Sequence, residues 1–148
     1  MNKDNKVPLK VFISYSWDSE EHKAWVKALA DRLKENGIDV LLDVYQPIGT
    51  SFTIFMHDGL RIADKVLIIG TPDYKTKAES HQRSVGVEDQ IINIDLSRDI
   101  STTKFIPVLR KGTFGTAFPI LIGDRLGFDF KDDAKFESEF TKLLNSLE

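Results

Sequence analysis

Short apolar runs alternate with segments of helical periodicity along the whole chain. Each run has the length and composition of a strand that is buried on both faces, as in a parallel sheet. The segments between the runs repeat apolar residues every three or four positions, the spacing of one helix face. We expect strands at residues 9–15, 38–42, 65–70, 103–109 and 126–130. We expect helices at residues 19–36, 51–63, 84–97 and 132–147. This alternation predicts an α/β fold, a five-stranded parallel sheet with helices on both faces.

Local signals set several of the element boundaries. Asp18 is suited to cap the first helix, with Glu21 as its capping-box partner. Gly37 supplies the left-handed residue that commonly ends a helix. The polar stretch 72–83 and the glycine-containing stretch 111–116 are both interpreted as loops.

Charge and cysteine content exclude several classes of function. The 148 residues suit one domain, and 20 basic against 23 acidic residues give a net charge of −3, which offers no electrostatic case for binding nucleic acid. The chain has no cysteine, which excludes disulfides, thiolate catalysis and cysteine-ligated metals, and which is compatible with the cytoplasmic location we expect. Neither a signal peptide nor a membrane-spanning run is visible, so we expect no membrane partner.

The predicted topology gathers one set of polar and aromatic residues. In a flavodoxin-like sheet of order 2-1-3-4-5, ligands bind beyond the carboxyl ends of the strands, between strands 1 and 3. The loops that follow the first three strands meet there, and we expect them to bring together Tyr15, Ser16, Trp17, Asp43, Tyr45, Ser84 and Glu88. Aromatic faces, hydroxyls and two carboxylates suit a ligand that carries a ring and a sugar.

Other chemistries of this topology lack their residues here. The first strand is not followed by Gly-x-Gly-x-x-Gly, and the chain has no Walker A lysine motif. A response-regulator receiver needs a phosphoacceptor aspartate after strand 3, where this chain has Gly70-Thr71. The histidines His22, His57 and His81 lack metal-ligand spacing, so we interpret them as surface or hydrogen-bonded residues and expect no metal site.

Glu88 has two interpretations when it is taken by itself. Val87, Ile91 and Ile94 share one face of the predicted helix, which places Glu88 in or near its first turn, four positions after Ser84. Negative charge is favoured at a helix N-terminus, so Glu88 should stay ionised. A solvated first-turn glutamate is the commoner case, because acidic residues are enriched in first turns, and a catalytic carboxylate is the alternative.

Four segments together resemble the Toll/interleukin-1 receptor (TIR) domain family. The sequence Val-Phe-Ile-Ser-Tyr-Ser-Trp-Asp at 11–18 resembles the first box of the family, especially its bacterial and SEFIR-like branches. Asp43 and the loop with Pro47 and Gly49 look like the BB loop, and Ser84-x-x-x-Glu88 resembles the catalytic signature. The Phe-Asp-Phe at 128–130 is similar to the closing segment.

The second and third boxes of the receptor-type domains are not intact. Leu42 precedes Asp43 where those domains have arginine, and Ile48 separates Pro47 from Gly49. Phe136 is not followed by tryptophan. These departures count against an animal adaptor and leave the enzymatic positions unchanged.

The resemblance implies an enzyme that cleaves the nicotinamide–ribose bond of NAD+, giving ADP-ribose or a cyclic form. It implies Glu88 as the catalytic residue, and Tyr15, Ser16, Asp43, Tyr45 and Ser84 as substrate-binding residues. NAD+ would be the substrate, and no cofactor is expected. The alternative is a non-catalytic scaffold that signals by TIR–TIR contact.

The resemblance also implies a biological setting. We expect residues 1–148 to form a single TIR domain, the N-terminal effector of a longer antiphage defence protein with a covalently linked sensor domain. Self-association through the BB loop, residues 43–50, is expected to activate it.

Overall fold

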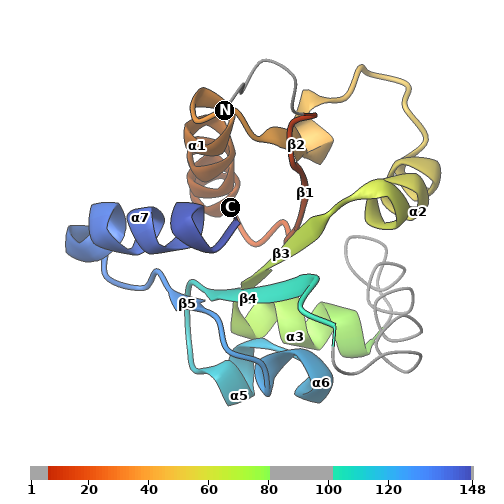
Figure 1. Cartoon of the computed structure of the whole chain (residues 1–148). Coiled ribbons are helices and arrows are strands. Elements are labelled where there is room, and N and C mark those ends of the chain that lie inside the picture. The colour runs from red at the N-terminus through yellow and green to blue at the C-terminus, as the bar shows by residue number, and fades with distance from the viewer. Residues whose placement is uncertain (1–6, 81–101, 148) are drawn as a thin grey trace.

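Five parallel strands form one sheet in the order β2-β1-β3-β4-β5, which confirms the predicted topology (Figure 1). The computed structural model describes residues 7–80 and 102–147. The strands are β1 (Lys10–Ser14), β2 (Asp39–Leu41), β3 (Lys65–Gly70), β4 (Phe105–Leu109) and β5 (Phe128–Asp129). All are parallel, so their carboxyl ends lie at one edge of the sheet.

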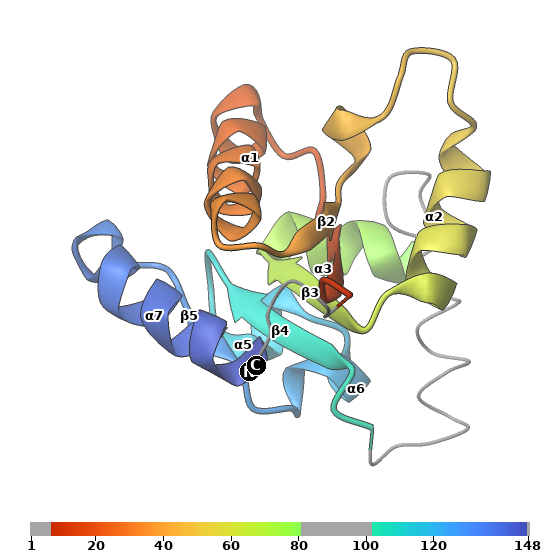
Figure 2. The same cartoon turned by 45° about the horizontal axis from the view of Figure 1, so that its top comes forward.

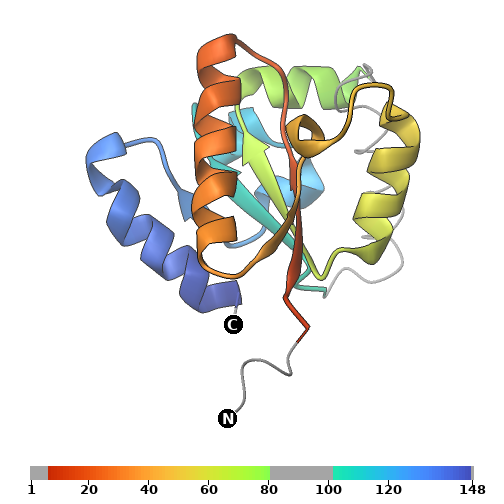
Figure 3. The same cartoon turned by 90° about the horizontal axis from the view of Figure 1, so that it is seen from above.

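Helices cover both faces of this sheet. They are α1 (Glu20–Glu35), α2 (Phe52–Ile62), α3 (Pro72–Glu79), α5 (Phe114–Ala117), α6 (Ile120–Gly123) and α7 (Phe136–Leu147). Short 3₁₀ turns, η2 (Asp43–Tyr45) and η3 (Asp133–Lys135), precede α2 and α7. The helices α1 and α7 pack on one face, and α2, α3, α5 and α6 pack on the other (Figures 2 and 3).

The two faces of β1 and β3 explain why these strands are apolar throughout. Successive side chains of a strand point to opposite faces. Val11 and Ile13 therefore join the core beneath α1 and α7, while Phe12 joins the core beneath α2 and α3. All three side chains are buried. A strand covered on both sides cannot alternate apolar and polar residues, so the continuous apolar runs were a reliable signal.

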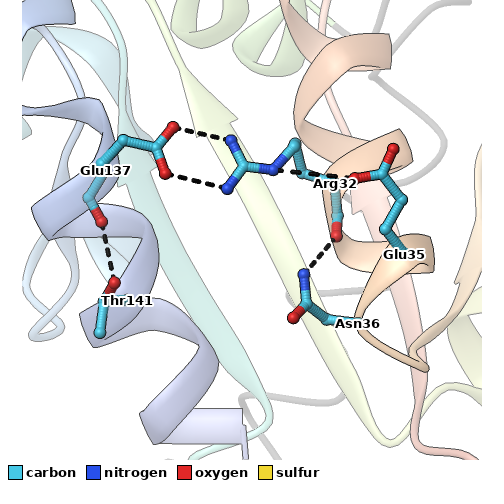
Figure 4. Close-up of polar contacts among 5 residues, drawn as sticks. All are labelled: Arg32, Glu35, Asn36, Glu137 and Thr141. Atoms are coloured by element: carbon cyan, nitrogen blue, oxygen red, sulfur yellow. Dashed lines mark hydrogen bonds and ion pairs between the residues drawn. The ribbon is translucent and has the colours of Figure 1, made fainter.

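An arginine–glutamate pair joins α7 to α1 across the outer surface. The guanidinium of Arg32 donates to both carboxylate oxygens of Glu137, with N–O distances of 2.7 and 2.9 Å (Figure 4). It also lies 4.6 Å from the centroid of the Phe140 ring. Arg32 thus pairs with the first turn of α7 and stacks on the buried face of the same helix.

The prediction of a loop at 72–83 is wrong over most of this range, because Pro72–Glu79 forms α3. The Thr71 side chain caps this helix by accepting from the backbone N–H of Tyr74 at 3.0 Å. Only Tyr74 and Ala78 are buried, one helical turn apart. Two apolar positions among polar ones are too few to show a helical period, although proline is common at the start of a helix.

The loop predicted at 111–116 is also partly wrong, because α5 begins at Phe114. Thr113 and Thr116 form a reciprocal capping box that starts this single turn. Gly112, with φ of 83°, makes the bend before it. A helix of one turn buries too little apolar surface to leave a periodic signal in the sequence.

The predicted cap of α1 lies one residue too early. Ser19, and not Asp18, accepts from the backbone N–H of His22 at 3.0 Å. The predicted stop is confirmed, since Gly37 follows α1 with φ of 85°. The helix predicted at 84–97 lies outside the described residues.

Candidate functional site

Asp43 ties together the loops that follow β1 and β2. The Tyr15 hydroxyl donates to Asp43 Oδ1 at 2.8 Å, and the Trp17 indole N–H donates to Oδ2 at 2.9 Å. The backbone N–H of Val44 also donates to Oδ1 at 2.8 Å. Hydrogen bonds to a carboxylate are stronger than neutral ones, so this contact fixes the start of η2 against β1. Tyr15 and Asp43 meet as the sequence predicts.

Ser16 connects the ends of β1 and β3. Its side chain is fully buried and donates to the carboxylate of Asp18. Its hydroxyl oxygen also lies 3.4 Å from Oγ1 of Thr71, the residue that caps α3. Ser16 therefore stands at the point where the strand order changes direction, as the topology predicts.

Tyr45 is directed toward α1 and does not join Tyr15, Ser16 and Asp43. Its hydroxyl donates to Asp31 Oδ1, and Lys27 donates to Oδ2 of the same carboxylate at 2.9 Å. The Lys34 ammonium lies 4.2 Å from the centroid of the Tyr45 ring. The hydrogen bonds from Tyr45 and Lys27 lower the pKa of Asp31, while burial and the Asp31 carboxylate raise the pKa of Tyr45. The second anchor of the loop after β2 is thus on α1.

A pocket of about 290 Å³ opens beside this loop. Its lining comes from the β1–α1 connection, the start of α1, the loop itself and α2. The residues that line it are Trp17, Lys23, Asp43, Val44, Gln46, Pro47, Ile48, Gly49, Thr50, Phe52 and Phe55. The loop projects from the body of the molecule between β2 and α2 (Figure 2). Gly49 makes its bend with φ of 101°, a conformation that other residues rarely adopt.

Three residues of this pocket were not predicted from the sequence. Lys23 has the position of an ordinary surface residue on α1. Phe52 and Phe55 belong to an aromatic stripe that we interpreted as core, and Phe55 does pack on Phe12 with ring centroids 5.5 Å apart. Both phenylalanines remain half-buried and line the pocket as well. The signal that could have revealed them is their proximity in sequence to the loop that carries Pro47 and Gly49.

The predicted catalytic residue, Glu88, and its neighbour Ser84 lie outside the described residues. Their roles stay predictions that rest on the sequence. Within residues 7–80 and 102–147, no three His, Asp or Glu side chains gather as metal ligands do. In the same part of the chain, no helix is long and apolar enough to cross a membrane.

Residues 11–144 match the family model described as TIR domain. The chain belongs to the TIR domain family. The sequence matches no curated protein. TIR domains include NAD+-cleaving enzymes and scaffolds, and they self-associate.

Solved structures share the fold along nearly the whole TIR domain. A prokaryotic SEFIR domain is 34% identical with a TM-score of 0.73, and the match covers 94% of this chain and 92% of that one. The TIR domains of the activated Roq1 resistosome, which directly recognizes the pathogen effector XopQ, are 12% identical with a TM-score of 0.69, covering 95% and 99%. The TIR domain of the Toll-related receptor TRR-2 from Hydra magnipapillata is 18% identical with a TM-score of 0.65, covering 93% and 96%.

His22 departs from the prediction that the histidines are exposed or hydrogen-bonded. Its side chain is 4% exposed, and its Nε2 is buried without a hydrogen-bond partner among the described residues. The ring lies 6.2 Å from that of Tyr15. Burial lowers the pKa of His22, and the charge of Asp18 opposes this while Lys111 and Arg110 add to it. The prediction was wrong for His22 because a histidine that follows two acidic residues in the first turn of a helix has the sequence pattern of an exposed residue.

Proposed function

We propose that this TIR domain is an NAD+ nucleosidase that cleaves the nicotinamide–ribose bond, giving nicotinamide and ADP-ribose or its cyclic form. The observation that carries the proposal is the Ser84-x-x-x-Glu88 sequence in a chain of the TIR family, which includes NAD+-cleaving enzymes. The pocket beside the BB loop supports it, because apolar rings and a fixed carboxylate suit a ligand with a ring and a sugar.

The chemistry needs only one catalytic carboxylate. Ordinary glycosidases use two, since the leaving oxygen must be protonated. In NAD+ the nicotinamide ring is cationic, so it leaves the ribose as a neutral molecule and no general acid is required. The remaining task is to stabilise a ribosyl cation of oxocarbenium character. An ionised Glu88 would do this by charge and by hydrogen bonds to ribose hydroxyls.

In this proposal the described residues would bind the substrate and would keep the loops of the site in position. Asp43 has its oxygens engaged by Tyr15, Trp17 and Val44, so it positions the indole at the wall of the pocket. Ser16 would keep the ends of β1 and β3 in register beneath the substrate. In this proposal the contribution of Tyr45 is indirect, because its hydroxyl holds the BB loop on α1.

Substituting Glu88 tests the proposal. Glu88→Gln keeps the shape of the side chain but removes its charge, and we expect nicotinamide release to fall about a hundredfold, which corresponds to roughly 3 kcal/mol. Ser84→Ala should have an intermediate effect, because a neutral hydroxyl can only orient other groups. Glu35→Gln, an exposed glutamate at the end of α1, is the matched control and should be as active as the wild type. Thermal melting should be almost the same for all of these proteins. A folded Glu88→Gln protein with wild-type activity would refute the mechanism.

A scaffold that signals by homotypic contact is the second candidate. The match to a prokaryotic SEFIR domain, at 34% identity over 94% of this chain, favours it. So does the apolar surface around the BB loop, where Val44, Ile48 and Ile54 are exposed. A scaffold predicts no nicotinamide release from NAD+ by the wild type at any protein concentration, and the same assay therefore separates the two candidates.

A further inference from the structure

The pocket beside the BB loop has one cationic side chain among its described lining residues, that of Lys23. Lys23 is the fourth residue of α1 and lines the pocket together with residues of the BB loop. Its ammonium is 5.7 Å from the centroid of the Trp17 ring, over the ring face. A lysine in the wall of a pocket that also contains aromatic side chains can pair with a negatively charged group of a ligand.

The other charged group of the pocket is already committed to the protein. Both oxygens of Asp43 accept hydrogen bonds, from Tyr15 and Val44 on one side and from Trp17 on the other. Lys23 is held less firmly. Its ion-pair partner Glu20 is 3.5 Å away, and the Glu20 side chain is 93% exposed. Exposed pairs of this kind contribute little, so the ammonium can turn to an anion at small cost.

Most of the remaining wall of the pocket is apolar, and Gln46 and Thr50 are its uncharged polar residues. Phe52 lies edge-on to Trp17 with ring centroids 5.6 Å apart, and Phe55 lines the wall beside Phe52. The volume of about 290 Å³ is near the lower end for small-molecule sites. Such a pocket fits one ring and one anionic group, which is one half of a dinucleotide and not the whole.

We propose that Lys23 recognises phosphate, and that this pocket binds a nucleoside phosphate with its ring against Phe52 and Phe55. The inference rests on the proposed function in one respect, since it assigns the pocket to one nucleotide half of NAD+. A nucleoside without phosphate would lose the contact with Lys23 and keep only the apolar contacts.

Calorimetric binding of AMP, adenosine and inorganic phosphate to the full chain tests this inference without using catalysis. We expect the wild type to bind AMP about tenfold more tightly than adenosine, since one charge-assisted hydrogen bond is worth about that factor. Inorganic phosphate alone should bind more weakly than AMP. Lys23→Gln should bind AMP and adenosine equally.

Lys142→Gln is the matched control. Lys142 also pairs with a glutamate three positions before it, Glu139, but it lies on α7. This variant changes the net charge by the same amount and should bind AMP like the wild type. Equal loss of AMP binding in both variants would overturn the proposal in favour of overall charge. Unchanged AMP binding by Lys23→Gln, or phosphate alone binding as tightly as AMP, would also overturn it.

The outcome is independent of the proposed catalytic activity. If the protein releases no nicotinamide but binds AMP through Lys23, the assignment of the nucleotide pocket stands and the proposed nucleosidase activity is refuted. If wild type and Lys23→Gln cleave NAD+ with equal KM, and the wild type does not prefer AMP to adenosine, the proposed nucleosidase activity stands and the assignment of the pocket is refuted.

Discussion

The surroundings of His22 differ from what its position in the sequence suggests. It lies in the first turn of α1, yet its ring is packed against Tyr15 and lies near charges from three other segments. Asp18 comes from the loop after β1, Asp73 from α3, and Arg110 and Lys111 from the end of β4. Burial has the largest effect and lowers the pKa of His22, so the folded protein favours the neutral ring.

This shift predicts how stability changes with pH. An unfolded histidine takes up a proton near its ordinary pKa of about 6.5, while the folded one resists, so acid favours unfolding. The contribution of His22 to the free energy of unfolding should be constant above this value and fall below it, by at most about 1.4 kcal/mol per pH unit. Replacing His22 with phenylalanine should remove this component, because the ring then carries no titrating group. Urea unfolding between pH 5.5 and pH 8 measures it. The exposed His57 provides the control, and a His57→Gln protein that lost the same component would contradict the assignment.

At the scale of elements, one side chain of α1 makes both a paired hydrogen bond and a ring contact with α7. Arg32 binds Glu137 with two hydrogen bonds and stacks on Phe140. Lysine has neither the planar fork nor the stacking surface, so Arg32→Lys should lower the melting temperature although the charge is unchanged. The drop should be only a few degrees, because the pair is exposed. Lys27→Arg, on the same helix and paired with Asp31, is the control and should melt like the wild type. Identical melting of Arg32→Lys and wild type would show that the contact contributes nothing.

The elements also show which parts of the fold can be predicted from sequence. The sheet was predictable because β1, β3 and β4 are buried on both faces, and continuous apolar runs are rare elsewhere. The helix α3 was not, because Tyr74 and Ala78 are its only buried residues. Residues at strand ends were placed together correctly for Tyr15 and Asp43. Topology fixes the position of a strand end, but the direction of a side chain in a short 3₁₀ turn, as for Tyr45, depends on local packing.

The pocket residues outside the BB loop could not be predicted from the sequence, for a different reason. Lys23 belongs to a helix face whose role is decided by the loop that lies beside it. No local pattern distinguishes a lysine that faces a pocket from one that faces water. Contacts between segments far apart in sequence become visible only when the sheet order is combined with the actual course of the loop.

For the whole molecule, the BB loop is the feature that we expect to couple assembly to activity. Asp43 anchors the start of the loop to Tyr15, which follows β1, and Tyr45 anchors it to Asp31 of α1. The middle of the loop carries the fully exposed Ile48. A loop that forms one wall of the pocket and presents an apolar side chain to solvent can change the pocket when a second copy covers it.

We therefore expect the proposed NAD+-cleaving activity per molecule to rise with protein concentration. Ile48→Asp should suppress the rise, because an aspartate cannot be buried between two copies without a partner, and it should leave the melting temperature unchanged because Ile48 makes no buried contact. Val7→Asp is the control, since Val7 is 80% exposed and lies before β1, at the opposite edge of the sheet. The measurement is nicotinamide release over a wide dilution series, with sedimentation at the same concentrations. Activity per molecule that stays constant while the protein associates would show that assembly and catalysis are separate, and a Val7→Asp protein that behaves like Ile48→Asp would remove the BB loop from the mechanism.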